Sequence, residues 1–237
     1  MLITFSSSLN VVCLNWKQYD IVPLMDIGKK NEKRLKIYPR YNNILELFSY
    51  FMSFNFKNPS KLFSWFYSLF CPIYGKFYYK ELLKAIELTG SESILDFGSG
   101  AGVLAKKIVK ELSYEGKLTC LDRSDAFLKK ARKKLRKYTN VDFILGDIRE
   151  VGIPSNTFDI ITISWVIHHL PKEELPDIIQ SIVNALKSNG KVYVIEFLAL
   201  PHGIAEEELF KFFNRMGLSE SVVFRKKKTG IFEFKKK

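Results

Sequence analysis

The feature that most restricts the fold is the run Ser93–Gly102, which reads SILDFGSGAG. Its apolar first half predicts a short buried strand. The second half has a glycine at every second position, which predicts a tight turn with backbone N–H groups facing outward. The apolar residues of 103–112 then recur at helical spacing, with lysines on the opposite face. A strand, a glycine loop and a helix N-terminus in this order are typical of a nucleotide-type site in an α/β fold.

The spacing of the glycines narrows the class of ligand. The dinucleotide motif G-x-G-x-x-G would need a third glycine where Val103 stands. An acid, Asp96, instead precedes the first glycine, Gly98, by two residues. A carboxylate at this place repels a pyrophosphate but suits a ligand that carries positive charge. S-adenosylmethionine (SAM) has a sulfonium and an amino group and no phosphate, so we predict SAM as the cofactor.

Acidic residues also follow the next two expected strands. The strand Lys117–Asp122 ends on an acid, 20 residues beyond the last glycine, near the roughly 20-residue offset at which an acid meets ribose hydroxyls in such folds. The strand Val141–Leu145 is followed by Asp147, which is placed to accept a hydrogen bond from an adenine amino group, and by Ile148, which offers an amide and an apolar contact. Because neighbouring parallel strands end side by side, these groups should converge with the glycine loop.

Strands and helices alternate along the rest of the chain. A buried strand is expected over Thr157–Ser164, a helix over Pro171–Lys187, a fifth strand over Lys191–Leu198 and a helix over Glu206–Met216, before a closing antiparallel pair. This alternation predicts an α/β fold, namely a Rossmann-like, seven-stranded, mostly parallel sheet with helices on both faces and a C-terminal antiparallel hairpin. The domains expected are a poorly defined N-terminal extension over residues 1–40, an aromatic-rich segment over 41–75 and the α/β domain over 76–237.

The segment Tyr41–Tyr79 holds 15 of the chain's 34 aromatic residues. A break at Asn58-Pro59 divides it into two expected helices, Ile44–Phe56 and Ser60–Phe70. Both are apolar around much of their circumference, so three arrangements stay open: packing over the sheet, a lid over a lipophilic substrate, or contact with a membrane surface. No stretch approaches the ~20 consecutive apolar residues of a membrane-spanning helix.

The motif Asp96-x-Gly98-x-Gly100-x-Gly102 resembles the first motif of class I SAM-dependent methyltransferases, and the likeness covers residues 75–237. The runs Phe158–Leu170 and Leu186–Lys191 are similar to the small-molecule branch that includes quinone-ring C-methyltransferases. The resemblance implies transfer of a methyl group from SAM to a small, lipophilic acceptor. It also implies the cofactor-binding residues, which are Asp96, Gly98, Ser99, Gly100 and Gly102 at the methionine end, Asp122 at the ribose, Arg123, Asp147 and Ile148 at the adenine, and Ser164 beneath the methyl group.

Two adjacent histidines, His168 and His169, stand just beyond the fourth strand, where the acceptor should lie. Methyl transfer from a sulfonium is an in-line displacement, so a base is needed only if the acceptor must lose a proton. Histidine titrates near neutrality, which makes this pair the candidate base, with local packing as the alternative. We expect no metal site, because no third ligand stands nearby. His202 is a further candidate at the acceptor site.

The net charge of the chain is compatible with partners other than a small molecule. Lysine plus arginine number 37 against 25 acids, a formal net charge of +12, which favours anionic surroundings. Two other hypotheses therefore stand beside a small-molecule enzyme with peripheral membrane contact: an RNA methyltransferase that uses the basic face of residues 124–137, and a SAM-binding partner subunit without catalysis. The three cysteines lie far apart, which indicates a reducing cytoplasm, with membrane association as an option. The sequence does not specify the oligomeric state.

Overall fold

The computed structural model describes residues 2–3, 19–23, 35–39, 75–198, 203–226 and 228–236. The chain divides into two compact units, Met1–Phe51 and Met52–Lys237. In the first unit, β1 (Leu2–Ile3), β2 (Tyr19–Pro23) and β3 (Leu35–Pro39) form an antiparallel sheet in the order β1-β3-β2. The two expected aromatic helices, and with them the lid and membrane-contact hypotheses, lie outside the described residues, as does His202.

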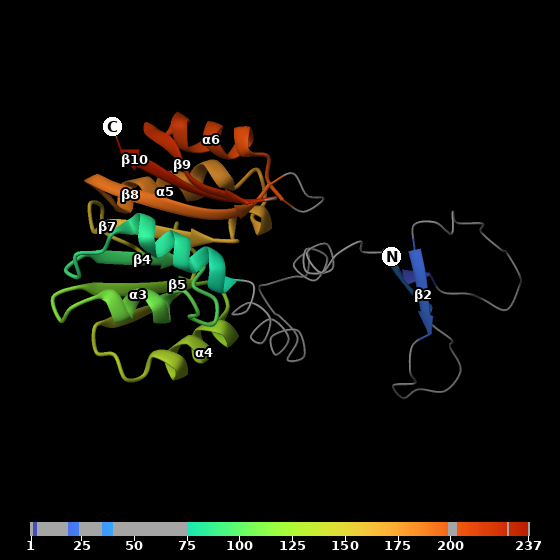
Figure 1. Ribbon diagram of the computed structural model, residues 1–237, viewed down its shortest axis with the longest axis horizontal. Coiled ribbons are helices and arrows are strands. Elements are labelled where there is room, and N and C mark those ends of the chain that lie inside the picture. Colours follow the sequence, from blue (N-terminus) through green and yellow to red (C-terminus); the bar gives the residue numbers. More distant parts are fainter. Residues whose placement is uncertain are drawn as a thin grey trace, which may run out of the picture. The chain divides into compact units, whose positions relative to one another are not determined.

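The second unit is built on a seven-stranded sheet in the order β6-β5-β4-β7-β8-β10-β9 (Figure 1). Its five parallel strands are β4 (Ser93–Phe97), β5 (Lys117–Asp122), β6 (Val141–Leu145), β7 (Phe158–Ser164) and β8 (Leu186–Phe197). The C-terminal strands β9 (Leu218–Lys226) and β10 (Thr229–Lys236) join antiparallel at the edge beside β8. The predicted α/β architecture with a closing hairpin is confirmed.

Helices cover both faces of this sheet (Figure 1). They are α3 (Ala105–Glu111), α4 (Asp125–Leu135), α5 (Leu175–Ala185) and α6 (Glu206–Arg215), with a short 3-10 turn, η1 (Ile167–His169), and a helix over residues 75–86. Right-handed crossovers place α3 and α4 on one face and α5 on the other, because the chain runs outward from β4 in opposite directions. Among the described residues, no helix has the length and apolarity to cross a bilayer.

The core lies where β7 and β8 run through the middle of the sheet. Leu95, Ile161, Ile163 and Val194 are fully buried there, as expected for strands covered on both faces. The apolar stripe of α5 packs onto the same cluster. Burying each such side chain contributes about 1.5–3 kcal/mol, so the central strands form a rigid base for the loops at their C-terminal ends.

The boundary between α5 and the fifth strand differs from the prediction. The helix begins at Leu175 rather than Pro171, and β8 begins at Leu186, inside the expected helix end. Two contacts explain the early strand: Leu186 pairs with Phe158 of β7, and the Lys187 ammonium holds the Asp159 carboxylate at 2.8 Å. Helical spacing alone carries no information on such cross-strand partners.

Candidate functional site

The glycine loop lies at the C-terminal end of β4 and is fastened to β5. The backbone N–H groups of Gly98 and Ser99 donate to the Leu121 carbonyl at 2.8 and 3.0 Å. The N–H of Gly100 donates to Asp122 Oδ2 at 2.7 Å. The expectation that these amides face outward is therefore wrong: the loop crosses the end of β5, and its donors are satisfied there. The amides of Gly98, Ser99 and Gly100 therefore form no open row of donors at this edge of the sheet.

The glycines themselves are required by conformation and by space. Gly98 and Gly102 have φ of +69°, and Gly100 has φ of +53°, a region that side-chain-bearing residues rarely adopt. A Cβ on Gly98 would also stand 2.4 Å from Val166 Cγ2, in the segment that follows β7. The loop thus packs directly against the chain that leads into η1.

Asp96 is almost fully buried, at 2 % exposure, in the middle of the sheet's C-terminal edge. Its Oδ1 accepts a hydrogen bond from Thr162 Oγ1 at 2.9 Å, and its Oδ2 has no hydrogen-bond partner among the described residues. Burial raises the pKa of Asp96 to about 7, the nearby Asp122 charge adds to the rise, and the Thr162 hydroxyl opposes it. A positively charged ligand group beside Asp96 would restore its ionised form.

Asp122, the acid predicted to meet a ribose, joins the loop to the start of α4. Its Oδ2 accepts from Gly100 N–H and its Oδ1 from Ser124 N–H, at 2.7 and 2.8 Å. Burial raises the pKa of Asp122, and these backbone donors oppose the rise. Each carboxylate oxygen has a second lone pair, so two hydroxyl donors can still be accepted.

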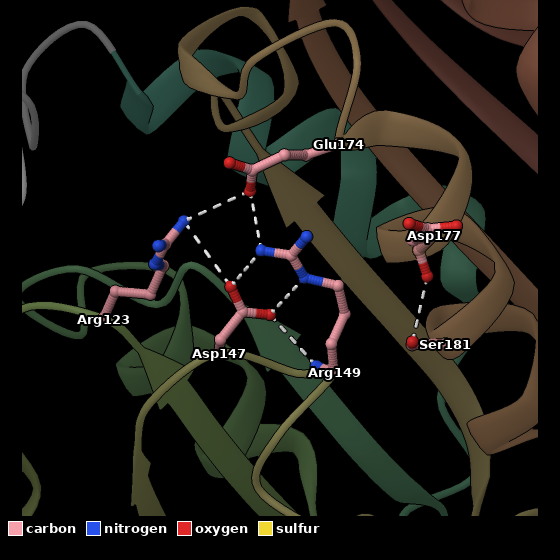
Figure 2. A network of polar contacts seen from close by, with 6 residues as sticks. All are labelled: Arg123, Asp147, Arg149, Glu174, Asp177 and Ser181. Atoms are coloured by element: carbon pink, nitrogen blue, oxygen red, sulfur yellow. Dashed lines mark hydrogen bonds and ion pairs between the residues drawn. The ribbon is translucent and has the colours of Figure 1, made fainter.

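Asp147 is held in a four-residue ionic cluster, which Figure 2 shows from close by. Arg149 makes a bidentate pair with it, Nε to Oδ1 at 2.9 Å and Nη2 to Oδ2 at 2.7 Å, and also reaches Glu174 at 2.6 Å. Arg123 Nη1 lies 3.6 Å from Asp147 Oδ2 and 4.0 Å from Glu174. The cluster ties the ends of β5 and β6 to the N-terminus of α5. Sequence analysis missed Arg149 and Glu174, because nothing local marks a pair 25 residues apart.

The remaining expected residues lie at the same edge. Ile148 is buried in the main hydrophobic core. Ser164 ends β7, and its Oγ is buried with no hydrogen-bond partner among the described residues. His168 and His169 form η1, with ring centroids 3.8 Å apart. Apart from the loop glycines, these residues bring buried polar groups together around the ends of β4, β5 and β7.

Buried polar atoms that lack partners mark the place of a ligand. Within the described part of the chain, Asp96 Oδ2, Ser124 Oγ, Ser164 Oγ and His168 Nε2 are buried and make no hydrogen bond. An unsatisfied buried polar group costs about 1–3 kcal/mol, so native proteins rarely keep several together. All four belong to the C-terminal edge, where open α/β sheets bind their ligands. The edge is therefore built for a polar ligand with both donors and acceptors.

The ionic cluster gives a pH-dependent prediction for stability. The Arg149 side chain lowers the pKa of Asp147 from 3.8 to about 2, so this carboxylate stabilises the fold above about pH 4 and loses that contribution as the pH falls toward 2. We expect Arg149→Gln to lower the free energy of unfolding by about 1–3 kcal/mol at pH 7. In urea titrations, the difference from the wild type should shrink between pH 4 and pH 3.

A matched control is the exposed pair Lys117–Asp142, whose side chains are 59 % and 56 % exposed. Lys117→Gln should change the free energy of unfolding by less than about 0.5 kcal/mol at every pH. A loss for Arg149→Gln that stayed constant from pH 7 to pH 3 would contradict the assignment of Asp147 as its partner.

Comparison with known proteins agrees with this geometry. Residues 94–190 match the family model of the methyltransferase domain. A similar curated protein is the ubiquinone/menaquinone biosynthesis C-methyltransferase UbiE of Salmonella arizonae, 32 % identical over 109 residues, which are 45 % of this chain and 43 % of that protein. The UbiE of Salmonella newport matches to the same extent. The chain thus spans less than half the length of these curated relatives.

Solved structures show the same fold. A SAM-dependent methyltransferase from Aquifex aeolicus superposes with a TM-score of 0.59 at 20 % identity, over 66 % of this chain and 88 % of that one. The N-methyltransferase NodS from Bradyrhizobium japonicum, in complex with S-adenosylhomocysteine, gives a TM-score of 0.59 at 16 % identity, over 68 % and 86 %. Residues 94–190 are therefore similar to a methyltransferase domain, and the fold is that of the class I SAM-dependent methyltransferases. Within that class, the domain resembles the quinone C-methyltransferases.

Proposed function

We propose that the protein is a SAM-dependent methyltransferase that acts on a small, lipophilic acceptor. The observation that carries the proposal is the convergence of buried, incompletely satisfied polar groups at the ends of β4, β5 and β7. The match of residues 94–190 to the methyltransferase domain supports the reaction class.

The residues at this edge fit SAM. The unpartnered oxygen of Asp96 suits the cationic amino group of the methionine end, and Asp122 keeps free lone pairs for the ribose hydroxyls. Ile148 offers an apolar contact for the adenine. Asp147 is placed for the adenine amino group but shares its carboxylate with Arg149, so the two compete for the same oxygens. When bound, the cofactor supplies the activated methyl group, and the protein aligns the acceptor and excludes water.

A group of aromatic rings around Trp165, which follows β7, supports a lipophilic acceptor. Trp165 follows β7 and has φ of +54°, a strained conformation for so large a residue. Its ring stacks on Phe197 at 5.9 Å and meets Tyr78 and Tyr79 edge-on or tilted at 6.0 and 5.4 Å. His168 packs against the same Phe197 ring. A planar, apolar acceptor next to these rings would gain stacking contacts that a highly charged one would not.

The test is a methyl-transfer assay on the full chain with radiolabelled SAM. The probes are 1,4-naphthohydroquinone, a short-chain prenylated hydroquinone and total RNA. We expect label in a hydroquinone product and none in RNA. Label in RNA alone, or binding of S-adenosylhomocysteine without transfer to any probe, would contradict the proposed acceptor class. The similar curated proteins are named as C-methyltransferases of ubiquinone/menaquinone biosynthesis, which is why these probes are chosen.

The elevated pKa of Asp96, about 7, predicts how cofactor binding depends on pH. Only the ionised carboxylate attracts the cationic end of SAM, so the affinity should fall as Asp96 takes up a proton. We expect the dissociation constant of SAM, measured by isothermal titration, to rise about tenfold between pH 8 and pH 6. In Asp96→Asn, binding should be weak and nearly independent of pH.

A control for this prediction is Asp159→Asn. Asp159 lies at the N-terminal end of β7, whereas the proposed cofactor site lies at the C-terminal ends of the strands. The Asp159 carboxylate pairs with Lys187, and its pKa is lowered rather than raised. This variant should keep the wild-type pH dependence. If Asp96→Asn kept the same tenfold change, another group would be responsible and Asp96 would not contact the cofactor.

A further inference from the structure

The buried residue Glu196 was not singled out by sequence analysis, although it is an acid in an otherwise apolar strand. It lies in β8 with an exposure of 0 %. A buried carboxylate is costly unless donors surround it. Three N–H groups do so here: Phe197 N–H and His168 Nδ1 meet Oε1 at 2.8 and 2.5 Å, and His168 N–H meets Oε2 at 3.3 Å.

This geometry determines which ring nitrogen of His168 carries the proton. Oε1 of Glu196 acts as an acceptor for the Phe197 amide. If Glu196 is ionised, an unprotonated Nδ1 at 2.5 Å would set lone pair against lone pair, so an ionised Glu196 requires Nδ1 to be the donor. The other nitrogen, Nε2, is then left with a lone pair. It is buried, the side chain is 1 % exposed, and Nε2 has no hydrogen-bond partner in the part of the chain that the structure describes.

His168 also lies close to the proposed cofactor site. It is two residues beyond Val166, the side chain that fills the space beside Gly98 in the glycine loop. Its ring meets the Phe197 ring at 5.5 Å, within the aromatic group proposed to contact the acceptor. A buried histidine ring thus follows the segment that packs on the glycine loop and contacts one of the aromatic rings.

We infer that Glu196 is a positioning residue that holds His168 in the Nδ1–H tautomer, so that His168 Nε2, rather than His169, takes the proton that the methyl acceptor loses. This inference rests on the proposed function. The acceptor's O–H or acidic C–H bond gives its proton to Nε2, and the electron pair of that bond forms the new bond to the methyl carbon. The methyl–sulfur bond breaks with its electron pair on sulfur. The imidazolium that results is paired with the Glu196 carboxylate until it releases the proton to solvent.

The direct test is the tautomer itself, which needs neither cofactor nor acceptor. The chain has three histidines, so two-bond ¹H–¹⁵N spectra of the ¹⁵N-histidine-labelled full chain are simple, and His168→Gln assigns the signal. At pH 8 we expect His168 to be protonated at Nδ1 and unprotonated at Nε2. A proton on Nε2, alone or on both nitrogens, would overturn the inference, whether or not the protein methylates any probe.

Steady-state kinetics test the role of His168 as the base and of Glu196 as the residue that positions it. With the hydroquinone probe that the wild type methylates, His168→Gln should lower kcat by about 10²- to 10⁴-fold, and Glu196→Gln by about 10- to 100-fold. The dissociation constant of S-adenosylhomocysteine should stay within about twofold in both, which distinguishes this failure from loss of the cofactor site. His169→Gln should cost clearly less than His168→Gln. Equal losses for the two histidine variants, or full activity in Glu196→Gln, would contradict the assignment. If Glu196→Gln does not fold, the tautomer of His168 in the wild-type chain still tests the inference.

Discussion

Replacing Asp122 with alanine should weaken the binding of S-adenosylhomocysteine at least 100-fold, which corresponds to about 2.7 kcal/mol. The carboxylate has two tasks in the proposed complex. It holds the glycine loop and the start of α4 through Gly100 and Ser124, and it accepts the ribose hydroxyls. Hydrogen bonds to a charged group contribute about 1.5–3 kcal/mol each, so loss of the loop contacts alone approaches the expected effect. Isothermal titration at pH 8 measures it.

Two further variants give an intermediate case and a control. In Asp122→Asn, the amide nitrogen must face one of the two backbone N–H groups, so we expect an intermediate loss of about 10- to 50-fold. Asp142→Ala, on the neighbouring strand β6, removes a half-exposed carboxylate that pairs only with Lys117 among the described residues, and should leave the affinity unchanged. Wild-type affinity in Asp122→Ala would remove the ribose assignment.

The second large effect concerns the fold of the glycine loop. Gly98→Ala combines a positive φ of +69° with a Cβ that would approach Val166 Cγ2 to 2.4 Å. The conformation costs about 1 kcal/mol and the overlap with the partly buried, packed Val166 side chain about 1–3 kcal/mol more. We expect the free energy of unfolding to fall by about 2–4 kcal/mol in urea titrations, and cofactor binding to weaken as the loop shifts.

Gly152 provides a matched control for Gly98. It has nearly the same φ, +66°, but nothing lies within 4 Å of an added Cβ. Gly152→Ala should therefore show only the conformational cost of about 1 kcal/mol. The difference between the two variants measures the contact between the glycine loop and Val166. Equal losses would mean that this contact is not tight in solution.

The sequence predicts the positions of the strands and helices more accurately than it predicts which strand residues pair with one another. The strand over Lys117–Asp122 is found with the same bounds, because an apolar run and an acidic end are local signals. The helix expected over Glu206–Met216 is found as α6 for the same reason. The predicted start of the fifth strand at Lys191 was wrong: β8 begins at Leu186, since pairing with Phe158 decides the start and no local pattern reports that pairing.

The same distinction holds at the candidate site. Asp96, Asp122 and Asp147 lie where the sequence placed them, because the C-terminal ends of parallel strands meet at one edge. Arg149, Glu174 and Glu196 were missed, since each matters through a partner distant in sequence. One signal did exist for Glu196: an acid within an apolar strand must be buried and therefore paired. The roles of all these residues toward a ligand stay predictions.

The central claim is that the acids at the ends of β4 and β5 and the glycine loop bind the adenosyl cofactor. A crystal structure of the full chain grown with S-adenosylhomocysteine tests it most directly. We expect the amino group of the ligand within hydrogen-bond distance of Asp96 and both ribose hydroxyls on Asp122. Density for the ligand elsewhere on the protein, or an empty loop at saturating ligand, would contradict the claim.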